Sequence, residues 1–462
     1  MANVAGDRTV RGAAAPATEA ALSASHRITT LPSGVRVVTE RMPGVRSAAL
    51  GFWIATGSAV EDVEQAGISH LLEHMLFRGT DRHSSEEIDQ IFDAMGAEIN
   101  AGTDKEATSV YSRVLDRHLE RAFEVIGEMV FRPRLAELEA ERAVVLEEIA
   151  MYEDDPQDRV FDALGGAVFG SHPLGRAVIG TAEAVGAVTS EQLHDFHARR
   201  YVPARVVISA AGSVEHEALV QMAERLPLAE RPCEEEPNSS AAPPDFRRRV
   251  RFIKKEVEQY HVCLGGEGPA RDDERRFGLR VLEGVLGGTS SSRLFQEVRE
   301  RRGLAYSVFS FSSLHARTGE VGVYVGTRRE NLAQALSVIS GELERCVRDP
   351  ATDEELVRSR ENLKGRVVLA MESTSARMSH LGTSVLSGLE ILSVDQLLER
   401  IDAVKLDELQ ELAAWLFAPK RMSVAGVGPD EQEFLQAVDS LGSSLAGENG
   451  RDAAAQARAA SR

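Results

Sequence analysis

The sequence predicts an α+β fold with two homologous domains from an internal duplication, each a mainly antiparallel sheet packed against helices. Three observations lead to this expectation. The chain has 462 residues, 43% of them hydrophobic, so it is long enough to bury two cores. A segment rich in Pro, Ser and acidic residues interrupts it near the middle. Similar segments occur on the two sides of this interruption.

The similar segments form two pairs. V-L-D-R-H-L-E-R-A-F-E-V-I-G-E-M-V-F-R-P, which ends at Pro133, is similar to the segment that ends at Pro350. E-R-A-V-V-L-E-E-I-A-M, which ends at Met151, is similar to E-N-L-K-G-R-V-V-L-A-M, which ends at Met371. The offsets within the pairs are 217 and 220 residues. Because the two offsets nearly agree, an internal duplication is favoured over coincidence.

The interruption divides the chain into five expected parts. Residues 227–245 have the composition of an interdomain linker. They separate an N-terminal domain at 26–226 from a C-terminal domain at 246–440, each of the usual domain size. Residues 1–25 and 441–462 are expected to form a disordered lead-in and a disordered tail.

Local patterns predict the first elements of the N-terminal domain. A Pro-Ser-Gly turn between two short β-branched runs predicts a hairpin at 27–41. The run S-A-A-L-G-F-W-I-A-T-G-S at 47–58 predicts another strand that leads into the helix at 66–79. Ser84 and Ser85 are suited to begin a helix, and Gly96 is suited to end it.

The next stretch predicts two strands and two helices. The strands are expected in A-E-I-N-A-G-T-D-K-E-A-T-S-V-Y-S-R-V-L, around a Gly-Thr-Asp turn at 102–104. The helices are expected at 116–131 and 135–152, because Arg132, Pro133 and Arg134 separate two helical patterns there.

Residues 66–79 read A-G-I-S-H-L-L-E-H-M-L-F-R-G and predict the short helix around which the chain is organised. At about 3.6 residues per turn, His70, Glu73 and His74 share one face. The other positions are almost all apolar, which predicts a buried helix. A buried polar stripe needs an internal partner, and a divalent metal is such a partner. The alternative is a solvated or hydrogen-bonded polar face without chemistry.

The predicted helix at 135–152 offers a further carboxylate. Glu148 shares a helical face with Glu141, two turns earlier, whereas Glu147 lies about a quarter turn away. The other members of that face are apolar: Val144, Val145, Met151 and Tyr152. Two carboxylates on an apolar face are costly unless they are paired or bind a metal. Glu148 is therefore the candidate third ligand, with Glu141 behind it.

Composition narrows the classes of partner. The formal net charge of −19 disfavours nucleic acid and anionic membrane surfaces, and it is compatible with a basic or mixed peptide substrate or simply with a solvated acidic surface. No apolar run approaches the length of a membrane span, and the first residues lack the apolar core of a secretory signal. Three widely spaced cysteines suit a reducing compartment, so a cytoplasmic location is expected.

The motif residues carry a family resemblance. H-L-L-E-H-M-L-F-R-G-T at 70–80 and E-R-A-V-V-L-E-E-I-A-M at 141–151 resemble the inverted-zincin peptidases of the pitrilysin and mitochondrial processing peptidase group, the M16 family. The resemblance extends from about His26 to Gly428 and includes H-P-L-G-R-A-V-I-G-T at 172–181. The length of the chain is similar to that of the two-domain subfamily.

The resemblance implies a zinc site and a catalytic base. His70, His74 and Glu148 would hold one zinc ion per chain. Glu73 would be the general base, and Glu141 would support the ligands.

One spacing departs from the family pattern. His74 and Glu148 are 74 residues apart, which is slightly shorter than expected of the group. A shortened loop would account for the difference. The departure leaves Glu147 open as an alternative third ligand.

The resemblance also implies residues that bind substrate. The family's Arg and Tyr pair, seven residues apart, corresponds to Arg299 and Tyr306 in the second half. The edge strand that pairs with the peptide would be A-E-I-N-A at 97–101, with Asn100 and Ala101 near the scissile bond. Asn100 is equally suited to form a turn.

These observations predict a zinc-dependent endopeptidase that hydrolyses extended peptides or small unfolded proteins, with Glu73 as the base. The alternative is a non-catalytic structural relative of the processing peptidases, and a third possibility is a module that binds metal without hydrolysis. Because the chain carries both the zinc motif and the Arg299 and Tyr306 pair, a homodimer that forms a closed chamber is expected.

Overall fold

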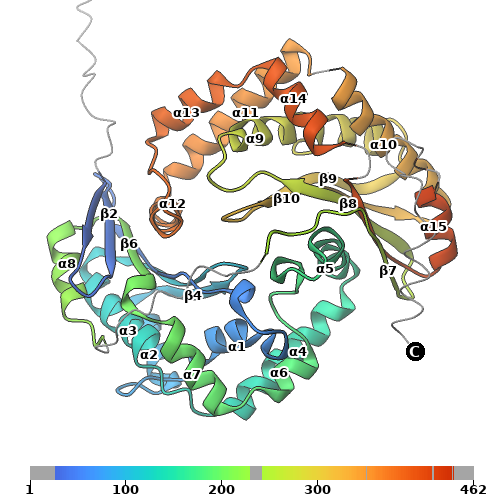
Figure 1. Ribbon diagram of the computed structural model, residues 1–462. Coiled ribbons are helices and arrows are strands. Elements are labelled where there is room, and N and C mark those ends of the chain that lie inside the picture. Colours follow the sequence, from blue (N-terminus) through green and yellow to red (C-terminus); the bar gives the residue numbers. More distant parts are fainter. Residues whose placement is uncertain (1–25, 229–241, 350, 419–420, 440, 442–462) are drawn as a thin grey trace, which may run out of the picture.

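The computed structural model describes residues 26–228, 242–349, 351–418, 421–439 and 441, and Figure 1 shows its two sheets with helices around them. The expected lead-in, most of the expected linker and all of the expected tail except Leu441 lie outside the described residues. Leu441 packs in the core of the second sheet.

The first sheet has six strands in the order β1-β2-β6-β3-β5-β4. Strands β2 and β6 are parallel, and every other neighbouring pair is antiparallel. Strand β4 forms one edge of this sheet. The strands are β1 (Arg27–Thr30), β2 (Arg36–Arg41), β3 (Ser47–Ile54), β4 (Glu98–Thr103), β5 (Thr108–Leu115) and β6 (Val206–Gly212).

The second sheet has five strands in the order β7-β11-β8-β10-β9. Strands β7 and β11 are parallel, and the other pairs are antiparallel. Strand β9 forms one edge. The strands are β7 (Val250–Lys254), β8 (Gln259–Gly268), β9 (Ala305–Leu314), β10 (Gly319–Arg328) and β11 (Ser423–Gly428).

The two sheets have the same topology. If β1 is set aside, β2 to β6 of the first sheet correspond in chain order to β7 to β11 of the second, and their neighbours and directions agree. The edge strands β4 and β9 occupy equivalent places. This agreement confirms the predicted α+β fold with two similar halves.

The helices lie on the faces of the two sheets (Figure 1). In the first half they are α1 (Ile68–Met75), α2 (Ser85–Met95), α3 (Leu119–Phe131), α4 (Leu138–Asp154), α5 (Pro156–Phe169), α6 (Ala182–Ala187), α7 (Ser190–Arg200) and α8 (His216–Glu224). In the second half they are α9 (Arg275–Leu286), α10 (Leu332–Arg348), α11 (Asp353–Met371), α12 (Thr374–Leu386), α13 (Val394–Ala403), α14 (Leu406–Leu416) and α15 (Glu431–Asp439).

Each half contributes one helix to the sheet of the other. Leu164 and Phe169 of α5 share an apolar cluster with Tyr324 and Val427 of the second sheet, and Figure 1 shows α5 against that sheet. Met378 of α12 belongs to a cluster with residues of β3 and β6 in the first sheet. The exchange joins the two halves through buried apolar contacts, which are the main source of stability in protein cores.

Most predicted elements are confirmed. The hairpin at 27–41 is formed by β1 and β2, and the next strand is β3. Ser84 caps α2 with a capping box, and Gly96 ends it in the left-handed region at φ 62°. The two predicted helices correspond to α3, preceded by a short 3-10 turn, and to α4.

Two local predictions are wrong. The turn after β4 lies at Asp104–Ala107 rather than at 102–104, because the Asp104 side chain accepts hydrogen bonds from the backbone of Glu106 and Ala107. The α4 face that carries Glu148 is expected to be buried, but Val144 and Met151 on that face are exposed to solvent.

Within the described residues, no helix combines the length and apolar character that crossing a bilayer requires.

Candidate metal centre

Helix α1 is fixed at its N-terminus by a buried carboxylate. Glu61 accepts hydrogen bonds from the backbone N–H groups of Gly67 and Ser69, each at 2.8 Å. Gly67 adopts φ 97°, and a Cβ there would lie 2.6 Å from the carbonyl oxygen of Ile179. The close approach therefore requires glycine. Burial raises the pKa of Glu61, and its hydrogen bonds to Gly67 and Ser69 oppose that rise.

The apolar side of α1 sets the direction of its polar side. Ile68, Leu71, Leu72 and Met75 are fully buried in the first core. Since residues three and four apart share a helical face, the opposite side presents His70, Glu73 and His74, and all three line one cavity.

Glu148 of α4 faces both imidazoles of α1. Its Oε2 lies 3.7 Å from His70 Nε2 and 3.3 Å from His74 Nε2. One ligand atom from each of these residues lies within 4.8 Å of the others. Zinc bonds of about 2.0–2.1 Å in a tetrahedral site separate neighbouring ligands by about 3.3 Å. The three side chains therefore fit a zinc ion, both in donor type and in spacing.

Glu141 orients His74. The Nδ1 atom of His74 lies 2.8 Å from Glu141 Oε1, and Arg78 donates a hydrogen bond to the other oxygen of this buried carboxylate. When Nδ1 carries the proton and donates it to Glu141, the lone pair of His74 is on Nε2, which faces Glu148. A metal-binding histidine has this arrangement.

His70 is held in its neutral form. Burial, together with the nearby His74, lowers the pKa of His70 to about 4. Its Nδ1 atom is buried without a hydrogen-bond partner in the described part of the chain. A neutral imidazole is the form that binds a metal.

Glu73 lies beside this cluster and contacts the edge strand. The Thr103 hydroxyl donates a hydrogen bond of 2.6 Å to Glu73 Oε2. Burial raises the pKa of Glu73, whereas Thr103 and His74 lower it and Glu148 raises it further.

The structure separates the two candidate third ligands. Glu147 is exposed and is not among the described residues that line the cavity, whereas Glu148 lines it. The geometry therefore favours Glu148.

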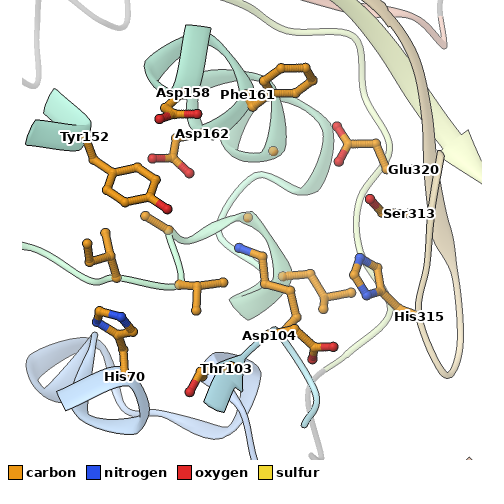
Figure 2. A pocket seen from close by; sticks show the side chains of 18 of the residues that line it. His70, Thr103, Asp104, Tyr152, Asp158, Phe161, Asp162, Ser313, His315 and Glu320 are labelled. Atoms are coloured by element: carbon orange, nitrogen blue, oxygen red, sulfur yellow. The ribbon is translucent and has the colours of Figure 1, made fainter. Parts of the chain in front are cut away.

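The cavity has a volume of about 930 Å³ and lies between the two halves. Figure 2 shows His70 and Thr103 on one side and His315 and Glu320, from the second half, on another. Burial raises the pKa of Glu320 to about 7, and Lys105 opposes the rise. Asp158, Phe161 and Asp162 of α5 complete this wall, so the exchanged helix forms part of the candidate site.

Arg299 and Tyr306 contact each other away from this cavity. Arg299 Nη1 donates a hydrogen bond of 3.1 Å to the Tyr306 carbonyl oxygen, and its guanidinium lies 4.6 Å from the Tyr306 ring centroid. The Arg299 guanidinium also lies over the Phe295 ring, 4.7 Å from the ring centroid. Neither Arg299 nor Tyr306 is among the described residues that line the cavity, and Tyr306 is 78% exposed. The structure thus pairs them but does not bring them to His70.

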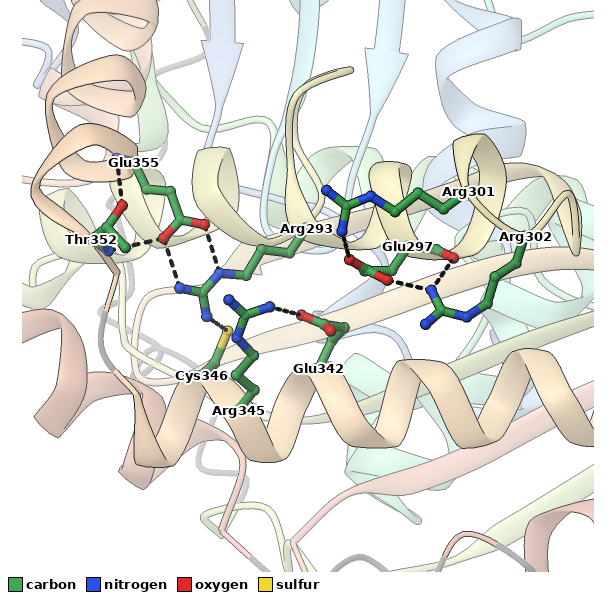
Figure 3. Close-up of polar contacts among 9 residues, drawn as sticks. All are labelled: Arg293, Glu297, Arg301, Arg302, Glu342, Arg345, Cys346, Thr352 and Glu355. Carbon is green, nitrogen blue, oxygen red and sulfur yellow. Dashed lines mark hydrogen bonds and ion pairs between the residues drawn. The ribbon is translucent and has the colours of Figure 1, made fainter.

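The helix that carries Arg299 is a π-helix, Phe295–Glu300, a rare form often found at functional sites. Figure 3 shows ion pairs around it. Glu297 of this helix forms ion pairs with Arg301 and Arg302, which follow the helix. Just before it, Arg293 binds Glu355 at 2.7 Å and lowers the pKa of Glu355 to about 2.

The predicted substrate strand is an edge strand, but its two named residues differ. Ala101 lines the cavity. Asn100 is exposed, points to the other face of β4, and accepts a hydrogen bond of 2.8 Å from the Ala101 backbone through its side chain. Thr103, two residues after Ala101, lies on the same face of β4 and also lines the cavity.

Sequence reasoning missed three contributors: Glu61, Thr103 and the carboxylates of α5. The period of two along β4 would have found Thr103, had the strand been extended beyond Ala101. Nothing in the local sequence indicates Glu61, because it lies six residues before Gly67 rather than at a capping position.

Comparisons with known proteins agree with this architecture. The family "Insulinase (Peptidase family M16)" matches residues 36–182, and "Peptidase M16 inactive domain" matches residues 187–363. A protein of Mycobacterium tuberculosis described as an uncharacterized zinc protease is 42% identical over 421 residues, which cover 90% of this chain and 95% of that protein. The similarly described YmxG of Bacillus subtilis is 40% identical over 390 residues, 84% of this chain and 95% of its own.

Two solved structures share the fold. A peptidase M16 inactive domain from Pseudomonas fluorescens has a TM-score of 0.81 and 22% identity, covering 88% of this chain and 98% of its own. A protease from Helicobacter pylori has a TM-score of 0.82 and 22% identity, covering 88% of this chain and 99% of its own. Together with the family matches, these similarities show that the chain belongs to the M16 (insulinase) peptidase family, in its two-domain subfamily.

Proposed function

We propose that this protein is a zinc-dependent endopeptidase that hydrolyses extended peptides or small unfolded proteins. The observation that carries the proposal is the convergence of His70, His74 and Glu148, with Glu73 beside them in one cavity. In this proposal one zinc ion is held per chain, and Glu141 supports the ligand set through His74.

In the proposed reaction, the zinc ion and the side chains would have separate roles. Zinc bound by these three residues would supply an acidified water and a positive charge for the substrate carbonyl. Glu73 accepts the proton of the attacking water and returns it to the leaving amine. The Glu73 carboxylate accepts a hydrogen bond from the Thr103 hydroxyl.

Strand β4 binds the substrate in this proposal. It is the edge of the first sheet, and Ala101, Gly102 and Thr103 line the cavity. An extended peptide can pair with such an edge through main-chain hydrogen bonds, which give affinity with loose sequence preference. The acceptors and donors of β4 that face away from β5 are therefore the substrate's partners.

A second copy of the chain completes the site. Arg299 and Tyr306 are preorganised by stacking, and Tyr306 is exposed. Since they do not line their own chain's cavity, a homodimer would bring them to the cavity of the other copy. There the Tyr306 hydroxyl would donate a hydrogen bond to the developing oxyanion, and Arg299 would bind a substrate carbonyl.

The decisive test separates metal binding from hydrolysis. Glu73→Gln keeps the shape of the side chain and removes the base. Zinc content, measured by elemental analysis, should stay at one ion per chain, while cleavage of a mixed peptide library should disappear. Cleavage that survives in Glu73→Gln would refute the assigned base. Zinc retained by His70→Ala would count against the ligand set.

The alternative, a non-catalytic relative with this fold, makes a different prediction. Such a protein cuts no peptide even when saturated with zinc. The presence of Glu73 beside three potential ligands favours the enzyme, because a structural subunit has no use for a buried base next to two imidazoles.

A further inference from the structure

The strand expected to bind substrate also holds the proposed base. Thr103 is the last residue of β4, and its hydroxyl lies 2.6 Å from Glu73 Oε2. Figure 2 shows Thr103 and His70, both of which line the cavity. Glu73 and Thr103 come from different elements, so this hydrogen bond connects α1 with the strand expected to bind substrate.

The hydrogen bonds of the neighbouring Thr108 hydroxyl determine which group accepts the hydrogen bond from the Thr103 hydroxyl. The buried Thr108 hydroxyl donates a hydrogen bond of 2.9 Å to the Thr56 carbonyl oxygen. Because a carbonyl can only accept, the Thr108 proton is committed to Thr56. The two hydroxyls of Thr103 and Thr108 are 3.5 Å apart, which is longer than a good O–H···O bond. The Thr103 hydroxyl therefore donates to the Glu73 carboxylate.

This hydrogen bond is of the strong, charge-assisted kind. Distances of about 2.5–2.7 Å are typical of a hydroxyl that donates to a carboxylate. The bond uses one lone pair of Oε2 and so fixes the orientation of the carboxylate. In the proposed reaction, a water O–H bond breaks and an O–H bond forms on the Glu73 carboxylate. Without the hydroxyl, the carboxylate loses one of its contacts with Thr103 and rotates more freely about its last side-chain torsion, which is broad for Glu.

We propose that Thr103 is a positioning residue for Glu73, through which the substrate-binding strand orients the general base. This inference rests on the proposed endopeptidase function. It gives the Thr103 side chain a role in the chemical step, which is distinct from the main-chain pairing of β4 with the peptide.

The test compares three variants. Thr103→Val removes the hydroxyl, keeps the side-chain shape and suits a strand. It should lower kcat about ten- to a hundredfold, the range expected for one hydrogen bond to a charged group, and leave KM within about twofold. Thr103→Ser keeps the hydroxyl and should stay within about threefold of the wild-type kcat. Ser112→Ala, a control that removes a hydroxyl bonded to the Glu98 backbone of β4, should leave kcat unchanged.

A binding measurement separates positioning from substrate contact. In the Glu73→Gln background, adding Thr103→Val should leave the Kd of a fluorescent peptide unchanged, because Thr103 acts on the base and not on the peptide. A weaker Kd would overturn the inference, as would a full kcat in Thr103→Val. If the wild-type protein itself cuts no peptide, the proposed function fails, and the inference fails with it.

Discussion

Glu106, at the turn between β4 and β5, forms an ion pair of 2.6 Å with Arg271 of the second half. The same carboxylate accepts a hydrogen bond of 3.0 Å from the backbone N–H of Ala316, between β9 and β10. Arg271 also donates to the Ser387 hydroxyl at 2.9 Å. The end of β4 is therefore linked to the second half of the chain.

This contact should stabilise the β4–β5 hairpin. Both side chains are partly buried, so Arg271→Met leaves the Glu106 carboxylate without its charged partner, at a cost of about 1–3 kcal/mol. The variant should show a lower Tm and faster cleavage of the hairpin by an added protease. Arg27→Met is the matched control, because Arg27 and Glu217 form an exposed pair worth about 0–1 kcal/mol. Equal behaviour of the two variants would contradict the prediction.

Glu320 should make stability depend on pH. Burial raises its pKa from 4.5 to about 7 in the folded chain. A raised folded-state pKa adds stability at pH values below about 4.5, and this contribution is lost as the pH rises toward 7. Glu320→Gln should therefore have a higher Tm than the wild type at pH 8, and the difference should shrink at pH 5.

The control for this experiment is Glu330→Gln, since Glu330 forms an exposed pair with Arg328. Its Tm difference from the wild type should be small at both pH values. A Glu320→Gln difference that does not change between pH 5 and pH 8 would show that Glu320 titrates normally.

Complementation between inactive chains tests the homodimer. His70→Ala removes a proposed ligand, and Arg299→Ala removes a proposed substrate contact. In a random mixture, half of the dimers contain one chain of each kind, and one site in each of these is complete. Mixing should therefore restore about a quarter of the wild-type activity. If co-expression restores no activity, each chain uses its own Arg299 or the protein acts as a monomer.

The sequence predicts those parts of the site whose geometry is local. His70, Glu73 and His74 lie within two turns of one helix, so the helical period alone places them together. The buried positions of α1, such as Leu71 and Met75, are the apolar ones expected. The contact of α1 with Glu148 is expected because two carboxylates on one helical face need a partner, although Val144 and Met151 of that face are exposed.

The exchange of α5 and α12 could not be predicted from the sequence. Each helix has a buried apolar face, but that pattern does not say which sheet covers it. The consequence for the site is large, because α5 places Asp162 in the cavity wall and the second half supplies Glu320. The family resemblance names Arg299 and Tyr306 as a pair, but nothing in the sequence indicates that Arg299 lies in a π-helix.

The binding of zinc by Glu148 is the most direct test of the central claim. The zinc dissociation constant should be measured for the wild type, Glu148→Ala and Glu147→Ala by competition with a chelator of known affinity. The account predicts that Glu147→Ala binds zinc like the wild type and that Glu148→Ala loses at least a hundredfold in affinity, about 2.7 kcal/mol. Equal zinc affinity in Glu148→Ala and Glu147→Ala would contradict it.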